Sequence, residues 1–164
     1  MRYKSDMDEC VAFYRIHKDK LCSYLMRFTG DYYLSCDIMQ ESFLRYFTRY
    51  REERNTALLY KIAKNALLDS LRRSKKNGQF DEESQVAPSS NQEDDVIIRE
   101  EYRRVIGAMQ KLQEGERDIL SLVVSGDLSY REIGELTGQS EANIKVKVHR
   151  ARIKLRDILQ GGER

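Results

Sequence analysis

Apolar side chains recur every three or four residues through most of the chain, which is the spacing of one face of an α-helix. The first apolar run goes from about Asp8 to Phe28, and Gly30 and Asp31 end it. In a second run, one broad and mainly apolar side is made up of Cys36, Met39, Gln40, Phe43, Leu44 and Phe47. A polar segment, 51–56, separates it from a third run. The pattern therefore predicts three helices in the first half of the chain.

The third predicted helix, over about residues 57–73, has an apolar side and a basic side. The apolar side, which we expect to face inward, is formed by Leu59, Ile62, Ala63, Ala66 and Ser70. The opposite side carries Lys61, Lys64, Asn65, Leu68 and Arg72. Such a helix packs on its neighbours through one face and presents cations on the other.

The apolar periodicity stops between Lys75 and about Asp95, in a segment that holds the only proline, Pro88. Between Gln79 and Ile98 there are six acidic residues and no basic one, with Ser, Asn and Gln among them. This composition predicts a flexible acidic linker.

After the linker, helical periodicity resumes over about 96–111, 114–124 and 129–156. Ser129 and Glu132 have the spacing of a capping box at the start of a helix. Gly138 can adopt the left-handed conformation that ends this helix, and Ser140 can cap the next one. The last segment is therefore predicted to form a helix-turn-helix, whose second helix enters the major groove of duplex DNA.

The second helix of this pair has two distinct faces. Its inward face is predicted to be Ile144, Val148, Ala151 and Leu155. The outward face is centred on Ala142, Val146, His149 and Ile153, and is flanked by Asn143, Lys145 and Arg150. Small side chains let a helix approach base edges, and Asn and Arg suit bidentate base contacts. A solvated basic face is the alternative interpretation.

Composition supports a helical protein. Of the 164 residues, 40% are hydrophobic and 34% charged, and proline, which breaks helix interiors, occurs once. We expect an all-α fold of two small helical domains joined by a flexible acidic linker. The expected domains are 1–75 and 96–164, with the linker at 76–95.

The net charge of +2 hides a strong segregation of charge. Six Lys or Arg and one Asp lie between Lys61 and Lys76, and six Lys or Arg and no acid lie between Asn143 and Arg156. Two basic patches predict two contacts with a polyanion. No apolar run approaches the ~18 residues that a membrane helix needs, and the N-terminus has no signal-peptide core. We expect a cytoplasmic protein without membrane insertion.

Little in the sequence points to catalysis or to a metal. Cys10, Cys22 and Cys36 are odd in number and lack paired metal-ligand spacing, so we expect reduced, structural cysteines. His17 lies on an apolar helical face and is predicted to be packed. Paired carboxylates alone do not make an acid/base site. We therefore expect no catalytic residue, no metal and no cofactor.

Three segments together resemble a known family. Asp37–Phe47 reads Asp-x-x-Gln-Glu-x-Phe, Leu59–Arg73 reads Leu-Tyr-x-Ile-Ala-x-Asn…Asp-x-x-Arg-Arg, and Ile144–Arg152 reads Ile-Lys-x-x-x-His-Arg-Ala-Arg. Their order and separation are similar to those of bacterial RNA polymerase sigma factors of the extracytoplasmic-function type. That type keeps two domains, sigma-2 and sigma-4, joined by a linker.

The resemblance implies that the acidic helix docks on the clamp helices of the largest polymerase subunit, while sigma-4 meets the flap. The docking residues would be Asp37, Gln40 and Glu41. Asp37 and Glu41 lie one helical turn apart, so their carboxylates can pair with arginines of the polymerase. Phe43, Leu44 and Phe47 are expected to pack the domain core.

The resemblance also assigns two DNA-reading sites. The minus-ten element would be read and melted by Lys61, Lys64, Asn65, Asp69, Arg72 and Arg73. The cations would attract phosphates and Asn65 would contact a base. Asp69 would orient its basic neighbours or cap an interaction. An extruded base would enter a pocket at about residues 50–57, where Tyr46, Tyr50 and Tyr60 either line the pocket or belong to the core.

The minus-thirty-five element would be read by Asn143, Lys145, Val146, Lys147, His149 and Arg150. The chain departs from the family pattern here and in sigma-2. It has no tryptophan, and Phe47 and Leu58 stand where the family carries one. Asn143 and Val146 also differ from the usual residues, so no promoter sequence can be carried over.

The expected function is transcription initiation: the protein directs core RNA polymerase to promoters whose two elements lie about 20 bp apart, or two turns of duplex.

The linker either threads the polymerase active-site cleft or is a solvated tether. An anti-sigma partner is expected. The rivals are a stand-alone helix-turn-helix regulator, which would need a dimer surface or a sensor domain, and a DNA-rearranging enzyme, which would need a nucleophile or metal site.

Overall fold

The computed structural model describes residues 2–50, 54–78 and 93–161, and in these ranges all the regular structure is α-helical. The helices are α1 (Arg2–Thr29), α2 (Tyr32–Arg49), α3 (Thr56–Lys76), α4 (Glu93–Gln110), α5 (Glu114–Ser125), α6 (Tyr130–Thr137) and α7 (Glu141–Gly161). The expected all-α class is confirmed. We call α1–α3 the N-terminal part and α4–α7 the C-terminal part.

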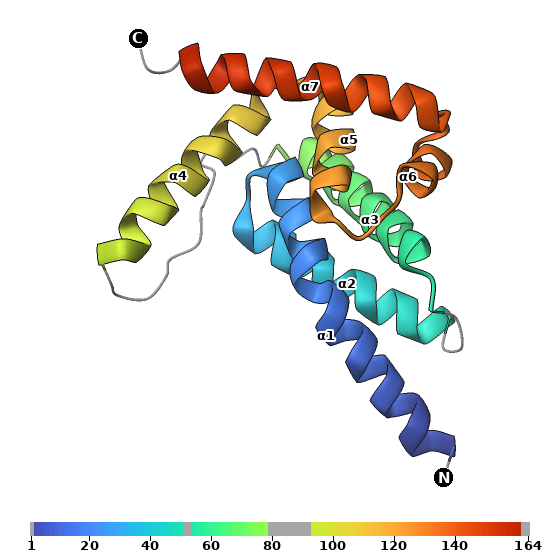
Figure 1. Ribbon diagram of the computed structural model, residues 1–164. Coiled ribbons are helices and arrows are strands. Elements are labelled where there is room, and N and C mark those ends of the chain that lie inside the picture. The colour runs from blue at the N-terminus through green and yellow to red at the C-terminus, as the bar shows by residue number, and fades with distance from the viewer. Residues whose placement is uncertain (1, 51–53, 79–92, 162–164) are drawn as a thin grey trace.

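The N-terminal part is a three-helix bundle in which α1 and α3 both pack against α2 (Figure 1). Side-chain caps set the helix starts: Asp31 accepts from the amide of Leu34, and Asn55 accepts from the amide of Leu58. The side chains buried between these helices include Leu21, Leu25, Ile38, Phe43, Leu59, Ala63 and Leu67. The long α1 extends beyond the bundle at its N-terminal end, as Figure 1 shows.

In the N-terminal part the structure overturns one prediction and decides between two alternatives that the sequence left open. Leu44 is 69% exposed, so its prediction as a core residue was wrong, whereas Phe43 is buried. Tyr46 and Tyr60 are both fully buried and therefore belong to the core. The Tyr46 hydroxyl accepts a hydrogen bond from the amide of Asn55 at 2.7 Å, which ties the end of α2 to the start of α3. Residues 51–53 of the expected base pocket lie outside the described residues.

The C-terminal part packs α5, α6 and α7 around a compact apolar centre. The buried side chains there include Ile119, Leu122, Ile133, Ile144, Val148 and Ala151. Gly134 lets α6 and the following turn approach closely, because a Cβ at this position would lie 2.5 Å from the carbonyl oxygen of Gln139. α4 begins at Glu93, three residues before the expected helix start.

The two parts lie against each other, with α1 beside α5 and α3 beside α6 (Figure 1). The apolar core runs continuously from one part into the other. The Arg117 guanidinium stacks 5.2 Å from the ring centroid of Phe28, and the Gln110 side chain donates to the Arg27 carbonyl at 3.1 Å. None of the described helices is long and apolar enough to cross a membrane.

Candidate nucleic-acid and protein interfaces

The helix-turn-helix forms from α6 and α7 as the sequence predicts. Ser129 accepts from the amide of Glu132, and the Glu132 carboxylate accepts from the amide of Ser129, which completes the capping box. Gly138 ends α6 in the left-handed conformation at φ 69°. Ser140 then accepts from the amide of Asn143 at 3.2 Å. The caps therefore fix both the turn and the start of the second helix.

α7 presents the predicted DNA-reading face to the outside. Its inward residues Ile144, Val148 and Ala151 are buried, as predicted. The exposed residues on the other side include Asn143, Lys145, Val146, His149 and Arg150. Lys147 is half-buried. Figure 1 shows α7 along one edge of the molecule, so its outer side is uncovered.

α2 carries the predicted polymerase-docking residues on an exposed stripe. Asp37 and Gln40 are exposed, and Glu41 is half-buried and ion-paired with Arg45 one turn later. Exposed apolar side chains extend the stripe at both ends: Tyr33 is 51% exposed and Leu44, as noted above, is even more so. Sequence reasoning missed these two residues, although their spacing of four from Asp37 and Gln40 places them on the same face.

α3 brings the predicted minus-ten residues onto one helix but not into one environment. Lys61, Asn65, Arg72 and Arg73 are exposed. Asp69 lies 3.8 Å from Arg72, which agrees with its predicted orienting role without testing it. Lys64 differs from the others because it points into the C-terminal part.

Asp118 of α5 is the partner of Lys64. Its side chain is 8% exposed, and one carboxylate oxygen lies 2.5 Å from Lys64 Nζ. The other oxygen accepts from the Tyr24 hydroxyl at 2.8 Å. Both partners belong to the N-terminal part, so a buried charge of one part is neutralised entirely by the other.

Asp127, in the turn between α5 and α6, makes a second set of contacts across the same boundary. Its side chain is 4% exposed and accepts from His17 Nδ1 at 2.8 Å and from Tyr60 Oη at 3.1 Å. Lys20 Nζ lies 3.3 Å from its other oxygen. The predicted packing of His17 is confirmed, since its ring also lies 4.4 Å from that of Phe13.

These contacts hold two tyrosines in their neutral form. Burial raises the pKa of Tyr24 well above its ordinary value, and the Asp118 carboxylate raises it further. Burial is also the main cause that raises the pKa of Tyr60, with Asp127 adding to it. A neutral phenol donates a hydrogen bond to a carboxylate, so both tyrosines are kept in the state that the two aspartates require.

Sequence reasoning missed Asp118 and Asp127 because an isolated acid reads as a surface residue. The available signal was weak: Asp118 directly precedes the apolar run from Ile119 onward and lies on the side of α5 that must be covered. No pattern within one part could reveal the other part as its partner.

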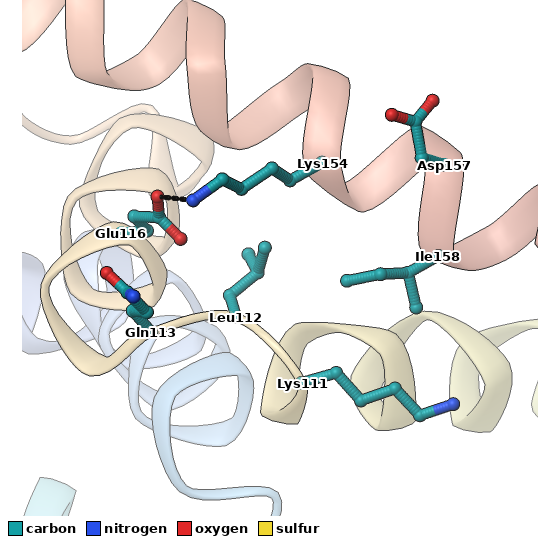
Figure 2. A pocket seen from close by; sticks show the side chains of 7 residues that line it. All are labelled: Lys111, Leu112, Gln113, Glu116, Lys154, Asp157 and Ile158. Atoms are coloured by element: carbon teal, nitrogen blue, oxygen red, sulfur yellow. Dashed lines mark hydrogen bonds and ion pairs between the residues drawn. The ribbon is translucent and has the colours of Figure 1, made fainter.

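A pocket of about 410 Å³ opens between the α4–α5 turn and the second half of α7 (Figure 2). Leu112 and Ile158 point toward each other across it, and the ion pair of Glu116 with Lys154 closes one end. The pocket begins at Lys154, one helical turn beyond Arg150 of the predicted DNA-reading face of α7. Among the described residues no cluster of His, Cys, Asp or Glu is suited to hold a metal ion.

The fold and its exposed faces define a helix-turn-helix protein whose two helical parts each carry a basic helix. Residues 13–77 match the family described as Sigma-70 region 2, and residues 102–155 match Sigma-70, region 4. The chain belongs to the sigma-70 family of RNA polymerase sigma factors and is of the extracytoplasmic-function type. It is a transcription initiation factor rather than a stand-alone regulator.

Relatives with assigned functions are similar over nearly the whole chain. ECF RNA polymerase sigma factor SigM of Bacillus subtilis (strain 168) is 27% identical over 153 residues, which cover 91% of this chain and 94% of SigM. ECF RNA polymerase sigma factor SigW of the same organism is 27% identical over 172 residues, covering 96% of this chain and 92% of SigW.

Two solved structures share the fold. The sigma factor RpoE, in a complex with the anti-sigma factor NepR from Bartonella quintana, superposes with a TM-score of 0.72 at 18% identity. That similarity covers 90% of this chain and 94% of RpoE. CnrH, in a complex with the cytosolic domain of CnrY, gives a TM-score of 0.70 at 20% identity and covers 94% of this chain and 90% of CnrH.

Proposed function

We propose that this protein joins core RNA polymerase through the exposed stripe of α2 and reads promoters through α3 and α7. The contrast between the two sides of α2 carries this proposal. Asp37 and Gln40 are exposed beside the buried Ile38 and Met39, so the helix offers polar groups outward on a rigid core. Leu44 adds an apolar anchor beside Glu41, and a buried apolar contact ringed by charges is typical of a protein interface.

The minus-thirty-five reader is the outer face of α7. Val146 and His149 lie at its centre, with Asn143 and Arg150 beside them as candidates for base contacts. Lys145 is ion-paired with Glu141 at 3.2 Å, which places its charge near the start of the helix. Lys147 is half-buried, so it suits a phosphate contact at the edge of the groove.

The minus-ten reader is α3. Lys61, Arg72 and Arg73 supply charge for the backbone of the melted strand, and Asn65 supplies a base contact. Lys64 belongs to this set only when it is free of Asp118. The division into 1–75, 76–95 and 96–164 remains our assignment of function to the chain, and linker residues 79–92 lie outside the described residues.

We assign the pocket shown in Figure 2 to the polymerase flap. Leu112 and Ile158 form an apolar floor, and Lys111 and Lys154 provide charges at its margin. An amphipathic helix with one apolar anchor fits this arrangement.

Ile158→Glu is expected to weaken flap binding while leaving duplex binding by α7 unchanged.

The protein acts by binding, without chemistry of its own, and works in the cytoplasm beside the polymerase. Regulation by an anti-sigma partner is part of the proposal, since the RpoE structure described above holds the anti-sigma factor NepR. Such a partner would act by covering the α2 stripe or by holding the two parts together.

A single experiment tests the docking proposal. The chain is mixed with core polymerase and promoter DNA, and co-elution and transcript formation are measured for the wild type, Asp37→Asn and Leu44→Glu. We expect both variants to bind core polymerase about tenfold more weakly or worse, which corresponds to about 1.4 kcal/mol of binding free energy. Thr48→Ala, exposed one turn beyond Leu44, is the matched control. Wild-type affinity in Leu44→Glu would refute the anchor.

A further inference from the structure

Cys22 and Cys36 lie beside each other between the first two helices. Cys22 is about two turns before the end of α1, and Cys36 is about one turn after the start of α2. Since α1 and α2 pack together and only Gly30 and Asp31 join them, both cysteines belong to the same end of a helical hairpin. Both are half-buried free thiols. We call them the hairpin thiols.

The side chains of the hairpin thiols interact directly. The Cys22 thiol hydrogen-bonds to Cys36, and the Tyr32 hydroxyl hydrogen-bonds to Cys36 as well. A disulfide forms between cysteines whose Cβ atoms lie close together and whose side chains point toward each other. Two thiols that already interact meet the second condition, so little movement of the backbone is needed to join them.

Cys10, the third cysteine, provides the contrast. It lies on the same helix as Cys22 but twelve residues earlier, which is about 18 Å along the helix axis at ~1.5 Å per residue. Its sulfur accepts a hydrogen bond from the Arg54 guanidinium at 3.5 Å. Of the three cysteines, only the hairpin thiols are therefore placed to form a disulfide within one chain.

We propose that Cys22 and Cys36 form a redox site, which a low-molecular-weight disulfide oxidises to a reversible disulfide bond between α1 and α2. Disulfides in a reducing cytoplasm are usually transient and redox-sensing, and a bond that forms and breaks is of this kind. It would close a loop of about 15 residues and so restrict the unfolded chain. The oxidised protein therefore resists unfolding better than the reduced one. This inference does not depend on the proposed function.

The two thiols have different roles in the exchange. Burial and the neighbouring Cys36 raise the pKa of the Cys22 thiol to about 12, so Cys22 keeps its proton until Cys36 has reacted. The Cys36 thiolate attacks one sulfur of the small disulfide, forms a mixed disulfide with it and releases one small thiol. Cys22 then loses its proton and attacks the Cys36 sulfur, which expels the second small thiol. Two electrons and the two thiol protons pass from the protein to the small disulfide.

The test compares the oxidised with the reduced full chain. The protein is treated with oxidised glutathione or with dithiothreitol, its remaining thiols are alkylated, and its tryptic peptides are identified by mass spectrometry. In the oxidised chain we expect the alkylation of Cys22 and Cys36 to be lost and their two peptides to be linked, with Cys10 outside the linkage. Dithiothreitol should restore alkylation of all three. The oxidised chain should remain a monomer on a non-reducing gel.

Cys36→Ser and Cys10→Ser are matched variants, because each removes one thiol and only the first removes a hairpin thiol. Urea unfolding is measured for both variants and for the wild type in each redox state. We expect oxidation to raise the urea midpoint of the wild type and of Cys10→Ser and to leave that of Cys36→Ser unchanged. The wild-type comparison needs no substitution, so it decides the question even if Cys36→Ser does not fold.

Three outcomes would overturn the proposal: hairpin thiols that are still alkylated after treatment with oxidised glutathione, a mixed disulfide that persists on Cys36, or a linkage between two chains. A disulfide that forms but does not raise the urea midpoint would overturn its stabilising role. None of these measurements involves polymerase or DNA, so the proposed function is tested separately.

Discussion

Tyr24 carries two properties that are usually separate, since it is both a core residue and a hydrogen-bond donor to a charge. Its ring lies 5.4 Å from that of Tyr60, and it is fully buried. Its hydroxyl donates to Asp118 across the boundary between the parts. The raised pKa of Tyr24 follows from this position, because burial disfavours an ionised phenol and the Asp118 carboxylate would repel it.

The raised pKa makes a pH prediction. The folded state holds the Tyr24 proton more tightly than the unfolded state, in which the pKa is about 10. The stabilisation is fully present below that pH and is lost as the pH rises above it. We expect the unfolding free energy to fall by up to about 1.4 kcal/mol per pH unit from this group. Tyr24→Phe should make the decline shallower.

The measurement for Tyr24 is urea unfolding at pH 8 and above pH 10. Tyr33→Phe is the control, because Tyr33 is half exposed, whereas Tyr24 and Tyr60 are the tyrosines that bond to Asp118 and Asp127. If the unfolding free energy falls equally with pH in Tyr24→Phe and in the wild type, folding does not raise the pKa of Tyr24. At neutral pH, Tyr24→Phe should lower the unfolding free energy by about 1.5–3 kcal/mol, because the hydrogen bond to the charged Asp118 is lost.

At the scale of elements, α6 and its turn depend on the absence of a side chain at Gly134. A Cβ there would lie 2.5 Å from a backbone oxygen of Gln139, and backbone cannot move aside as a flexible side chain can. The glycine therefore fixes how α6 meets the turn that starts α7. Gly107, inside α4, has no atom within 4 Å of its hypothetical Cβ.

These two helical glycines form a matched pair. Gly107→Ala is expected to stabilise the protein by about 0.5–1 kcal/mol, because alanine is the better helix former. Gly134→Ala should instead destabilise by about 1–3 kcal/mol, because the clash shifts the turn. Thermal unfolding compares the two, and duplex binding by Gly134→Ala should weaken with its stability. A stabilising Gly134→Ala would refute the close approach.

The comparison of sequence with structure is most informative at this scale. The inward and outward faces of α7 could be predicted because the buried residues Ile144, Val148 and Ala151 follow the helical repeat along a single helix. The local periodicity is therefore enough to identify the buried face. The exposure of Leu44 could not be predicted, because an apolar residue on a broad apolar helix face looks the same in the sequence whether it packs in the core or lies on a docking surface. Lys64 reads as a phosphate contact for the same reason: the carboxylate that covers it lies in a distant segment.

At the scale of the whole molecule, Asp118 and Asp127 join two bundles that the sequence predicts to be separate domains. The core is continuous across the boundary, and the side chains of Arg117 and Gln110 also make contacts across it. Two units that share a buried interface unfold together when the interface is strong relative to either unit alone.

We therefore expect one cooperative transition for the wild type in differential scanning calorimetry. The double variant Asp118→Asn, Asp127→Asn should give two transitions or one of clearly lower van't Hoff enthalpy, because each bundle then unfolds by itself. Glu116→Gln should keep the single transition of the wild type. Two transitions already present in the wild type would mean that the boundary contributes little to cooperativity.

The ion pair of Lys64 with Asp118 also has a consequence for how salt acts on the protein. A lysine that binds a phosphate releases a counterion from the nucleic acid, and each such cation adds about 0.7 to the slope of log affinity against log salt for single strands. While it is paired with Asp118, Lys64 is already neutralised within the protein and releases no counterion. Wild-type binding to single strands should therefore depend less on salt than binding by Asp118→Asn, because an internal carboxylate takes the place of the counterion at this lysine.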